Sequence, residues 1–156
     1  YIRLDTSGAE ATASVVRFNN EAPTSIHFTV GDDNAVNSST IHNYIAMLFA
    51  SVEGISKVGY YDGNGSDSTR TFSLGFEPRF FFVKNISTAS TPWLVLDTVR
   101  GFYTSGSPDG KRLMFNETTA QQSMNIVWRD SNGFKLNSDH SWVNASGDTY
   151  IYYGHA

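Results

Sequence analysis

Residues 141–156 read SWVNASGDTYIYYGHA, and residues 34–50 read NAVNSSTIHNYIAMLFA. The first stretch is a polar turn followed by TYIYYGHA, whose alternation is typical of a β-strand. The second stretch carries the same residues in the same order: Val-Asn, then Ser, then Tyr-Ile, then a final Ala. We therefore expect the chain to contain two related units, each closed by the same turn and strand.

The spacing of the shared residues supports an internal repeat. Val36-Asn37 and Val143-Asn144 are 107 positions apart, and RLDTSGAEAT from Arg3 corresponds loosely to RLMFNETTAQQS from Arg112. Three further pairs share a separation of 106 positions: Phe28 and Phe134, Tyr44 and Tyr150, and Ala50 and Ala156. The alternative is two unrelated strands that happen to share Phe and Tyr.

The repeat predicts a domain organisation. Residues 1–50 would be the C-terminal half of a preceding unit, and residues 51–156 one full module. Because the chain opens at YIRLDT without Met, we expect it to belong to a longer product. A half unit on its own would expose strand edges. We therefore expect residues 1–50 to pack with the rest, with Tyr44–Ala50 buried against the strand Phe80–Val83.

The rest of the chain is rich in short strand signals separated by turns. DSNG between NIVWR and GFKLN is a strong hairpin signal, and the four apolar residues Phe80–Val83 predict a strand covered on both faces. TIHNYIAMLFASVEGI fits a helix or a buried strand, and its flanking Asn, Ser and Gly favour the strand. Further strands are expected in SKVGYYDG, RTFSLGF and PWLVLDTV. The predicted fold is an all-β antiparallel β-sandwich, jelly-roll or lectin-like.

Composition excludes several functions. There are no cysteines, so disulfide scaffolds and thiol catalysis are excluded. The formal net charge is −4 with only 11 Lys and Arg, which argues against a nucleic-acid partner. The longest apolar runs, Ile45–Ala50 and Phe80–Val83, are far shorter than the roughly 20 residues of a membrane helix, so no membrane insertion is expected.

Several motifs occur in an order that resembles a known module. They are GYYDGNGS, LGFEPRFFFVKN, WLVLDTVRG, RLMFNETTAQ, NGFKL and VNASGDTYIYYGHA. This order is similar to a repeated β module of tail, tail-fibre and other virion proteins of tailed bacteriophages, many of them marine. The resemblance covers nearly all of residues 51–156, and residues 1–50 look like the end of a preceding copy. It implies a structural or adhesive virion module with no established catalytic residues. SSTIHNYI replaces the expected SGDTYI in the first copy, where Gly147 has no counterpart.

Acidic residues raise three chemical interpretations. DGNGSD places oxygen ligands at alternate positions, but it lacks the Gly and Glu of a calcium-binding EF-hand loop, so a turn on Gly63 and Gly65 is favoured. Asp97 and Arg100 in LDTVRG fit a tied turn better than a catalytic pair. A glycosidase would need two carboxylates in one cleft, and the sequence pairs none of its candidates, Asp97, Glu117, Asp130 and Asp148.

Aromatic side chains and histidines give the remaining candidates. The four histidines show no metal-ligand spacing, so no metal site, cofactor or catalytic residue is predicted. Exposed aromatic rings can stack on sugars, and core packing is the competing interpretation. In the loop SDHSWVNASG, His140 and Trp142 stand where the earlier copy has Asn34 and Ala35 or no counterpart. The ligand-binding candidates are Trp142, His140, Trp128 and Tyr103.

The functional hypothesis is therefore a phage virion structural module of a tail fibre or similar appendage. Its expected partners are other virion chains, as a homo-oligomer, and host-surface glycans. Its location would be the virion, outside the cell when mature. Two alternatives stay open: a stand-alone carbohydrate-binding lectin and a polysaccharide depolymerase domain.

Overall fold

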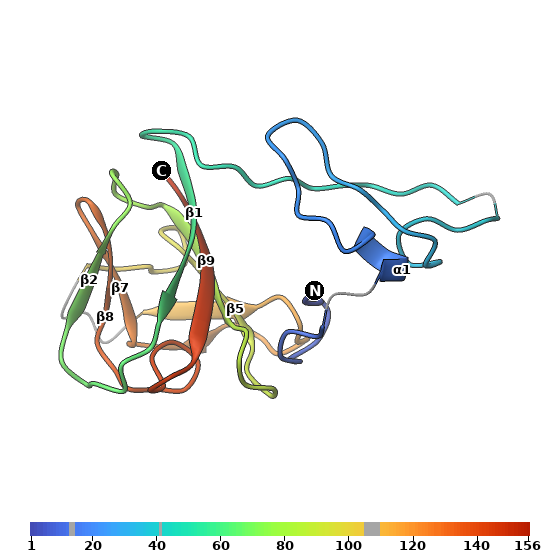
Figure 1. The fold of residues 1–156 in the computed structure, drawn as a ribbon. Coiled ribbons are helices and arrows are strands. Elements are labelled where there is room, and N and C mark those ends of the chain that lie inside the picture. The colour runs from blue at the N-terminus through green and yellow to red at the C-terminus, as the bar shows by residue number, and fades with distance from the viewer. Residues whose placement is uncertain (13–14, 41, 105–109) are drawn as a thin grey trace. The chain divides into compact units, whose positions relative to one another are not determined.

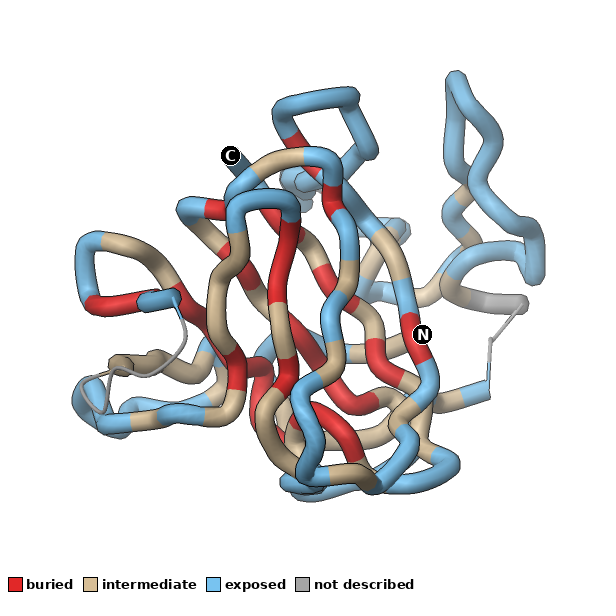
Figure 2. The backbone as a smooth tube through the Cα atoms, turned by 90° about the vertical axis from the view of Figure 1, so that its left-hand side faces the viewer, coloured by how far each residue is buried: buried red, intermediate tan, exposed pale blue. Residues whose placement is uncertain are grey.

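The structure is a computed structural model that describes residues 1–12, 15–40, 42–104 and 110–156. The chain divides into two compact units (Figure 1). Unit 1 comprises Tyr1 and Glu10–Leu48, and unit 2 comprises Ile2–Ala9 and Phe49–Ala156. Buried residues, red in Figure 2, belong to unit 2; among the residues whose burial is described, none before Ser56 is buried.

Unit 2 is an antiparallel β-sandwich, which confirms the predicted fold class. One sheet has six strands in the order β1-β9-β3-β4-β5-β6, and the other has three in the order β2-β8-β7. All the neighbouring strands are antiparallel. The strands are β1 (Ser56–Asp62), β2 (Arg70–Ser73), β3 (Phe80–Asn85), β4 (Trp93–Asp97), β5 (Lys111–Met114), β6 (Gln122–Ser123), β7 (Val127–Asp130), β8 (Gly133–Leu136) and β9 (Thr149–His155).

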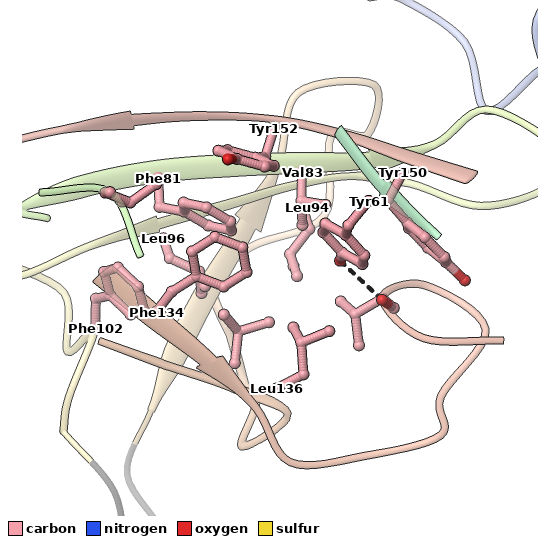
Figure 3. Close-up of a cluster of buried hydrophobic side chains, with 13 residues drawn as sticks. Tyr61, Phe81, Val83, Leu94, Leu96, Phe102, Phe134, Leu136, Tyr150 and Tyr152 are labelled. Carbon is pink, nitrogen blue, oxygen red and sulfur yellow. Dashed lines mark hydrogen bonds between the residues drawn. The ribbon is translucent and has the colours of Figure 1, made fainter. Parts of the chain in front are cut away.

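The core lies between the two sheets and is largely aromatic (Figure 3). The rings of Phe81 and Phe134 approach to 4.5 Å between centroids, and Tyr61 stacks on Tyr150 at 5.1 Å. The Tyr61 hydroxyl donates a hydrogen bond of 2.8 Å to the Val143 main-chain oxygen, drawn as the dashed line. The core residues are Tyr61, Leu74, Phe81, Val83, Leu94, Leu96, Phe102, Val127, Phe134, Leu136, Val143, Tyr150 and Tyr152.

The strand β3 is covered on both faces, as its four successive apolar residues predicted. Phe81 and Val83 are fully buried in the core. On the opposite face, Phe82 contacts the rings of Phe49 at 5.6 Å and Tyr153 at 5.5 Å. Alternate residues of β3 thus serve two aromatic clusters, one on each side of the large sheet.

The prediction of a buried strand in TIHNYIAMLFASVEGI was wrong, because no strand forms over residues 42–50. Ile45, Met47 and Leu48 are 92, 75 and 77% exposed. Phe49, at the start of the second segment of unit 2, does pack on β3, as was expected of Tyr44–Ala50. The corresponding strand β9 is hydrogen-bonded on both sides, to β1 and β3. Unit 1 has no described strand, so residues 42–50 have no neighbouring strand with which to form ladder hydrogen bonds.

The described residues of unit 1 form one helical turn, α1 (Val15–Phe18), and otherwise loops. Its tyrosine Tyr44 closes one of these loops. The Tyr44 hydroxyl accepts a hydrogen bond from Ser38 N at 2.8 Å and donates to Asn34 O at 2.8 Å.

Unit 2 repeats this arrangement 106 to 107 positions later. The Tyr150 hydroxyl accepts from Ala145 N at 2.8 Å and donates to Ser141 O at 2.9 Å. Ala145 and Ser141 lie 107 positions after the two partners of the tyrosine in unit 1. The two tyrosine hydroxyls therefore make equivalent hydrogen bonds in the two units.

The turn before each tyrosine is also the same. The main-chain oxygen of Asp33 accepts the N–H groups three and four positions later at 2.9 and 2.8 Å, and that of His140 does so at the same two distances. The side chain of Asp33 accepts Ala35 N, and the side chain of His140 accepts Trp142 N. The counterpart of His140 is thus Asp33, which corrects the alignment of His140 with Asn34.

Candidate functional site

Hydrogen bonds tie the loop after β1 to the loop before β9 in unit 2. Gly63 N donates to Asp148 O at 2.8 Å, and Gly65 N donates to Asn144 O at 2.8 Å. A Cβ atom on Gly63 would lie 2.0 Å from the main-chain oxygen of Ala145, so the two backbones approach this closely only because residue 63 is glycine.

The buried side chain of Asn144 completes this junction. Its Nδ2 atom donates to Asn64 Oδ1 and to Ser66 O, both at 2.9 Å, and its Oδ1 atom accepts Asn64 N at 3.1 Å. The stretch DGNGSD is therefore a loop held by VNASGD. Asn64 takes part in this junction through its side chain and its main-chain N–H, and Ser66 through its main-chain oxygen. Sequence spacing alone did not indicate that these two motifs meet.

A second polar cluster surrounds the buried residue Asn85 at the end of β3. Its Nδ2 atom donates to Asp148 Oδ2 at 2.8 Å and to the Tyr150 hydroxyl at 3.2 Å. Thr88 Oγ1 donates to the same Asp148 oxygen at 2.9 Å. Burial of its ring raises the pKa of Tyr150 to about 12. The Asp148 carboxylate, directly before β9, thus accepts hydrogen bonds from the end of β3 and from the loop that follows β3.

Asp97 and Arg100 tie down the turn after β4. The Asp97 carboxylate accepts Arg100 N at 2.9 Å and forms an ion pair with the Arg100 guanidinium. The main-chain oxygen of Asp97 accepts Phe102 N at 2.8 Å. These contacts agree with the turn interpretation of LDTVRG.

The other two carboxylates considered for hydrolysis are held separately. Glu117 accepts a hydrogen bond from Thr119 Oγ1 at 3.2 Å, and Asp130 pairs with Lys135 Nζ at 2.6 Å. Asp97, Glu117, Asp130 and Asp148 thus each have a different hydrogen-bonding or ion-pair partner.

Trp142 is half-buried and packs against the core. The Arg112 guanidinium carbon lies 4.2 Å from its ring centre, and the His140 ring meets it edge-on at 4.7 Å. Burial lowers the pKa of Arg112, whose Nη2 atom donates to Gln122 Oε1 at 2.6 Å. The cation–π contact brings the positive charge against the negative face of the ring. Two of the predicted ligand-binding residues, Trp142 and His140, are therefore brought together, with one ring face of Trp142 taken by Arg112.

Trp128 and Tyr103 lie by β7. The half-buried indole of Trp128 donates to Asn125 Oδ1, and the main-chain oxygen of Tyr103 accepts Arg129 N at 3.0 Å. In the described part of the chain, no ring contact joins Trp128 or Tyr103 to the pair formed by Trp142 and His140. The four candidates thus form two groups rather than one platform.

Sequence reasoning missed a fully buried lysine on β3. Lys84 Nζ donates to Asn85 O at 2.6 Å and to Thr91 Oγ1 at 2.8 Å, and among the described residues it forms no ion pair. Burial lowers the pKa of Lys84 to about 8. Its place directly after four apolar residues was the available signal.

Replacing Lys84 with methionine is expected to stabilise unit 2 at pH 7 by about 1 to 2 kcal/mol, because the charged amine is costly to bury. Between pH 8 and the unfolded-state pKa of about 10.4, the unfolded chain binds more protons, so the stability of the parent protein rises with pH. Urea unfolding from pH 7 to about 9.5 should show this rise in the parent and not in Lys84→Met. The control is Lys57→Met, at an exposed position of β1. A rise of equal size in Lys84→Met would contradict the assignment.

Unit 1 contains an apolar cavity of about 520 Å³. Its lining comes from the segments before and after the turn that follows Asp33, and it includes residues of α1 and of the stretch before Phe49. The lining residues are Phe18, Phe28, Val30, Ala35, Val36, Tyr44, Ile45 and Ala46.

Two further features are absent from the described residues. They contain no group of three or more His, Asp or Glu side chains placed to hold a metal ion. Within the same ranges, no helix has the length and apolar character needed to span a membrane.

No curated protein and no solved structure matches the chain. One family model does, and it spans residues 1–156, so it includes both units and every motif whose contacts are described above. The chain belongs to this family, DUF7483, a domain of unknown function.

Proposed function

We propose that the chain is a structural module of a bacteriophage virion, part of a tail fibre or a similar appendage, that contributes to contact with the host surface. The support from sequence is the ordered set of motifs that resembles phage virion modules. Its expected partners are other virion chains, in a homo-oligomer, and host glycans at the surface. Its expected location is the virion, outside the cell when mature.

The observation that carries the proposal is how the motif residues are used. Gly63 and Asn144 bind one loop to another, Asp97 holds the turn after β4, and Asp148 anchors a buried asparagine. Each of these polar groups is engaged in keeping the sandwich in one shape. A module whose motif residues hold its own loops and turns in place is suited to a mechanical role.

Immunogold electron microscopy of the phage that encodes this chain tests the proposal. Antibodies against the purified protein should label the tail or another surface appendage of intact particles. Labelling that is absent from particles but present in the lysate of infected cells would reject a virion role. Light scattering on the purified chain should give a mass above that of the monomer if the module itself assembles.

The lectin alternative depends on the cluster of Trp142, His140 and Arg112. Replacing Trp142 with alanine is expected to destabilise unit 2 by about 1 to 2 kcal/mol, roughly half the cost of removing a fully buried ring. Because Arg112 already covers a face of this ring, glycan-array signals should not change in the variant. Saturable glycan binding that is lost in Trp142→Ala and kept in an equally destabilised core variant would favour the lectin.

A further inference from the structure

We propose that the apolar cavity of unit 1 is the binding site for the first half of another copy of this module, a segment with the pattern of residues 51–109 that precedes Tyr1 in the same polypeptide. This inference rests on the internal repeat and on the two units, and it holds whether or not the protein is a virion component. The occupant would complete a second sandwich.

The lining of the cavity corresponds to half of a core that the structure shows complete. The 106- and 107-residue separations give most of the counterparts directly. For Phe18, the counterpart follows from a shared hydrogen bond, Gly31 N to Arg17 O in unit 1 and Asn137 N to Ile126 O in unit 2. Six lining residues thus match core residues: Phe18 with Val127, Phe28 with Phe134, Val30 with Leu136, Val36 with Val143, Tyr44 with Tyr150 and Ala46 with Tyr152.

The two copies differ sharply in burial. Phe134 and Tyr150 are fully buried, whereas Phe28 is 44% and Tyr44 46% exposed. These six residues are the entire contribution of residues 111–156 to the core of unit 2. Unit 1 therefore presents the same half of the core without the side chains that cover it in unit 2.

Unit 2 shows which side chains those are. Phe134 contacts Phe81 at 4.5 Å and Phe72 at 4.8 Å, and Tyr150 stacks on Tyr61 at 5.1 Å. The complementary core residues all come from the first half of the module: Tyr61, Leu74, Phe81, Val83, Leu94, Leu96 and Phe102. The cavity of unit 1 is thus lined by counterparts of residues that, in unit 2, pack against the core residues of the first half of the module.

The unpaired backbone of unit 1 points to the same occupant. The counterpart of residues 43–49 is β9, which is hydrogen-bonded to β1 on one side and to β3 on the other. In unit 1 this stretch forms no strand. A segment like residues 51–109 supplies both neighbours, since it contains the patterns of β1 and β3.

Asn144 and its counterpart Asn37 also differ between the two units. Asn144 binds Asn64 and Ser66 in the loop after β1. Its counterpart Asn37 is exposed, and the hydrogen bond that its side chain makes to a described residue goes to Gly31 O, at 2.9 Å. The loop that Asn37 would hold belongs to the first half of a module.

The chain's own first half is already packed in unit 2, so a second molecule of this chain has no free first half to offer. Because Arg3 corresponds to Arg112, a copy of residues 51–109 joined directly before Tyr1 restores the register of a full module. This extended protein contains the whole chain and is the test.

Hydrogen exchange read by mass spectrometry is measured on the chain and on the extended protein. Amides of residues 42–48 should exchange in the chain as in an open loop. In the extended protein they should slow by about 100-fold, the protection of a strand within a folded core. Binding of the dye ANS to the exposed apolar surface should fall at the same time.

A matched control uses the extended protein with Tyr61→Asp and Phe81→Asp in the duplicated segment only. It should leave residues 42–48 unprotected, while exchange in residues 149–155 shows that unit 2 is folded in all three proteins. The proposal is overturned if the extension leaves residues 42–48 unprotected while unit 2 is folded. It is also overturned if the control protects as well as the parent extension, or if the unextended chain dimerises with these residues protected.

Discussion

Replacing Phe134 with alanine is expected to lower the free energy of unfolding of unit 2 by about 3 to 5 kcal/mol. Phe134 is fully buried and contacts the rings of Phe72, Phe81 and Tyr152 at 4.8, 4.5 and 5.2 Å. Truncation removes the ring and leaves a cavity that strands of both sheets would have to close. Urea unfolding followed by tryptophan fluorescence measures the effect, because all three tryptophans lie in unit 2.

The repeat supplies the control for this substitution. Phe28 is the same residue at the equivalent position of unit 1, where it is 44% exposed. Phe28→Ala should change the unfolding of unit 2 by less than about 0.5 kcal/mol, as for a surface site. Losses of similar size in the two variants would mean that the two halves do not differ in burial as the structure shows.

Much of the sandwich followed from local sequence signals. The Asn-Gly turn of DSNG predicted the hairpin of β7 and β8, because these residues tolerate the backbone of tight turns. The apolar run Phe80–Val83 predicted a strand covered on both faces, and β3 is such a strand. Signals of this kind work where the partner strand lies in the same chain.

Residues 42–50 show where such reasoning fails. The pattern of NYIAMLF is that of a strand, and its counterpart β9 is one. Strand formation depends on ladder partners and on side-chain packing more than on intrinsic preference. The partners of β9 are β1 and β3, and unit 1 has no equivalents among its described residues. A strand pattern without neighbours therefore gave an exposed segment.

The candidate site was less predictable than the fold. Trp142 and His140 were singled out and do lie together, but the partner of Trp142, Arg112, is 30 residues away in the sequence. The sequence does not indicate that Lys84 and Asn85 are buried, because a lysine and an asparagine after an apolar run are typical of the exposed end of a strand. Only the pairing of β3 with β4 and β9 shows that both are buried.

Replacing Asn144 with alanine is expected to cost about 3 kcal/mol of stability in unit 2, because the buried side chain makes three hydrogen bonds, each worth roughly 1 kcal/mol. Its side chain accepts Asn64 N and donates to Asn64 Oδ1 and Ser66 O, so all three of those groups lose a partner at once. Thermal and urea unfolding measure the loss, and exchange at residues 63–67 should rise with it.

The matched variant is Asn37→Ala, at the equivalent position of unit 1. Asn37 is exposed and makes one hydrogen bond to Gly31 O, so its removal should cost about 0.5 kcal/mol or less. In the extended protein that supplies a first half before Tyr1, however, Asn37 would gain the loop that Asn144 holds in unit 2. The cost of Asn37→Ala should then approach that of Asn144→Ala. An Asn37 variant that stays neutral in the extended protein would show that the added segment does not form the junction, even if it covers the cavity.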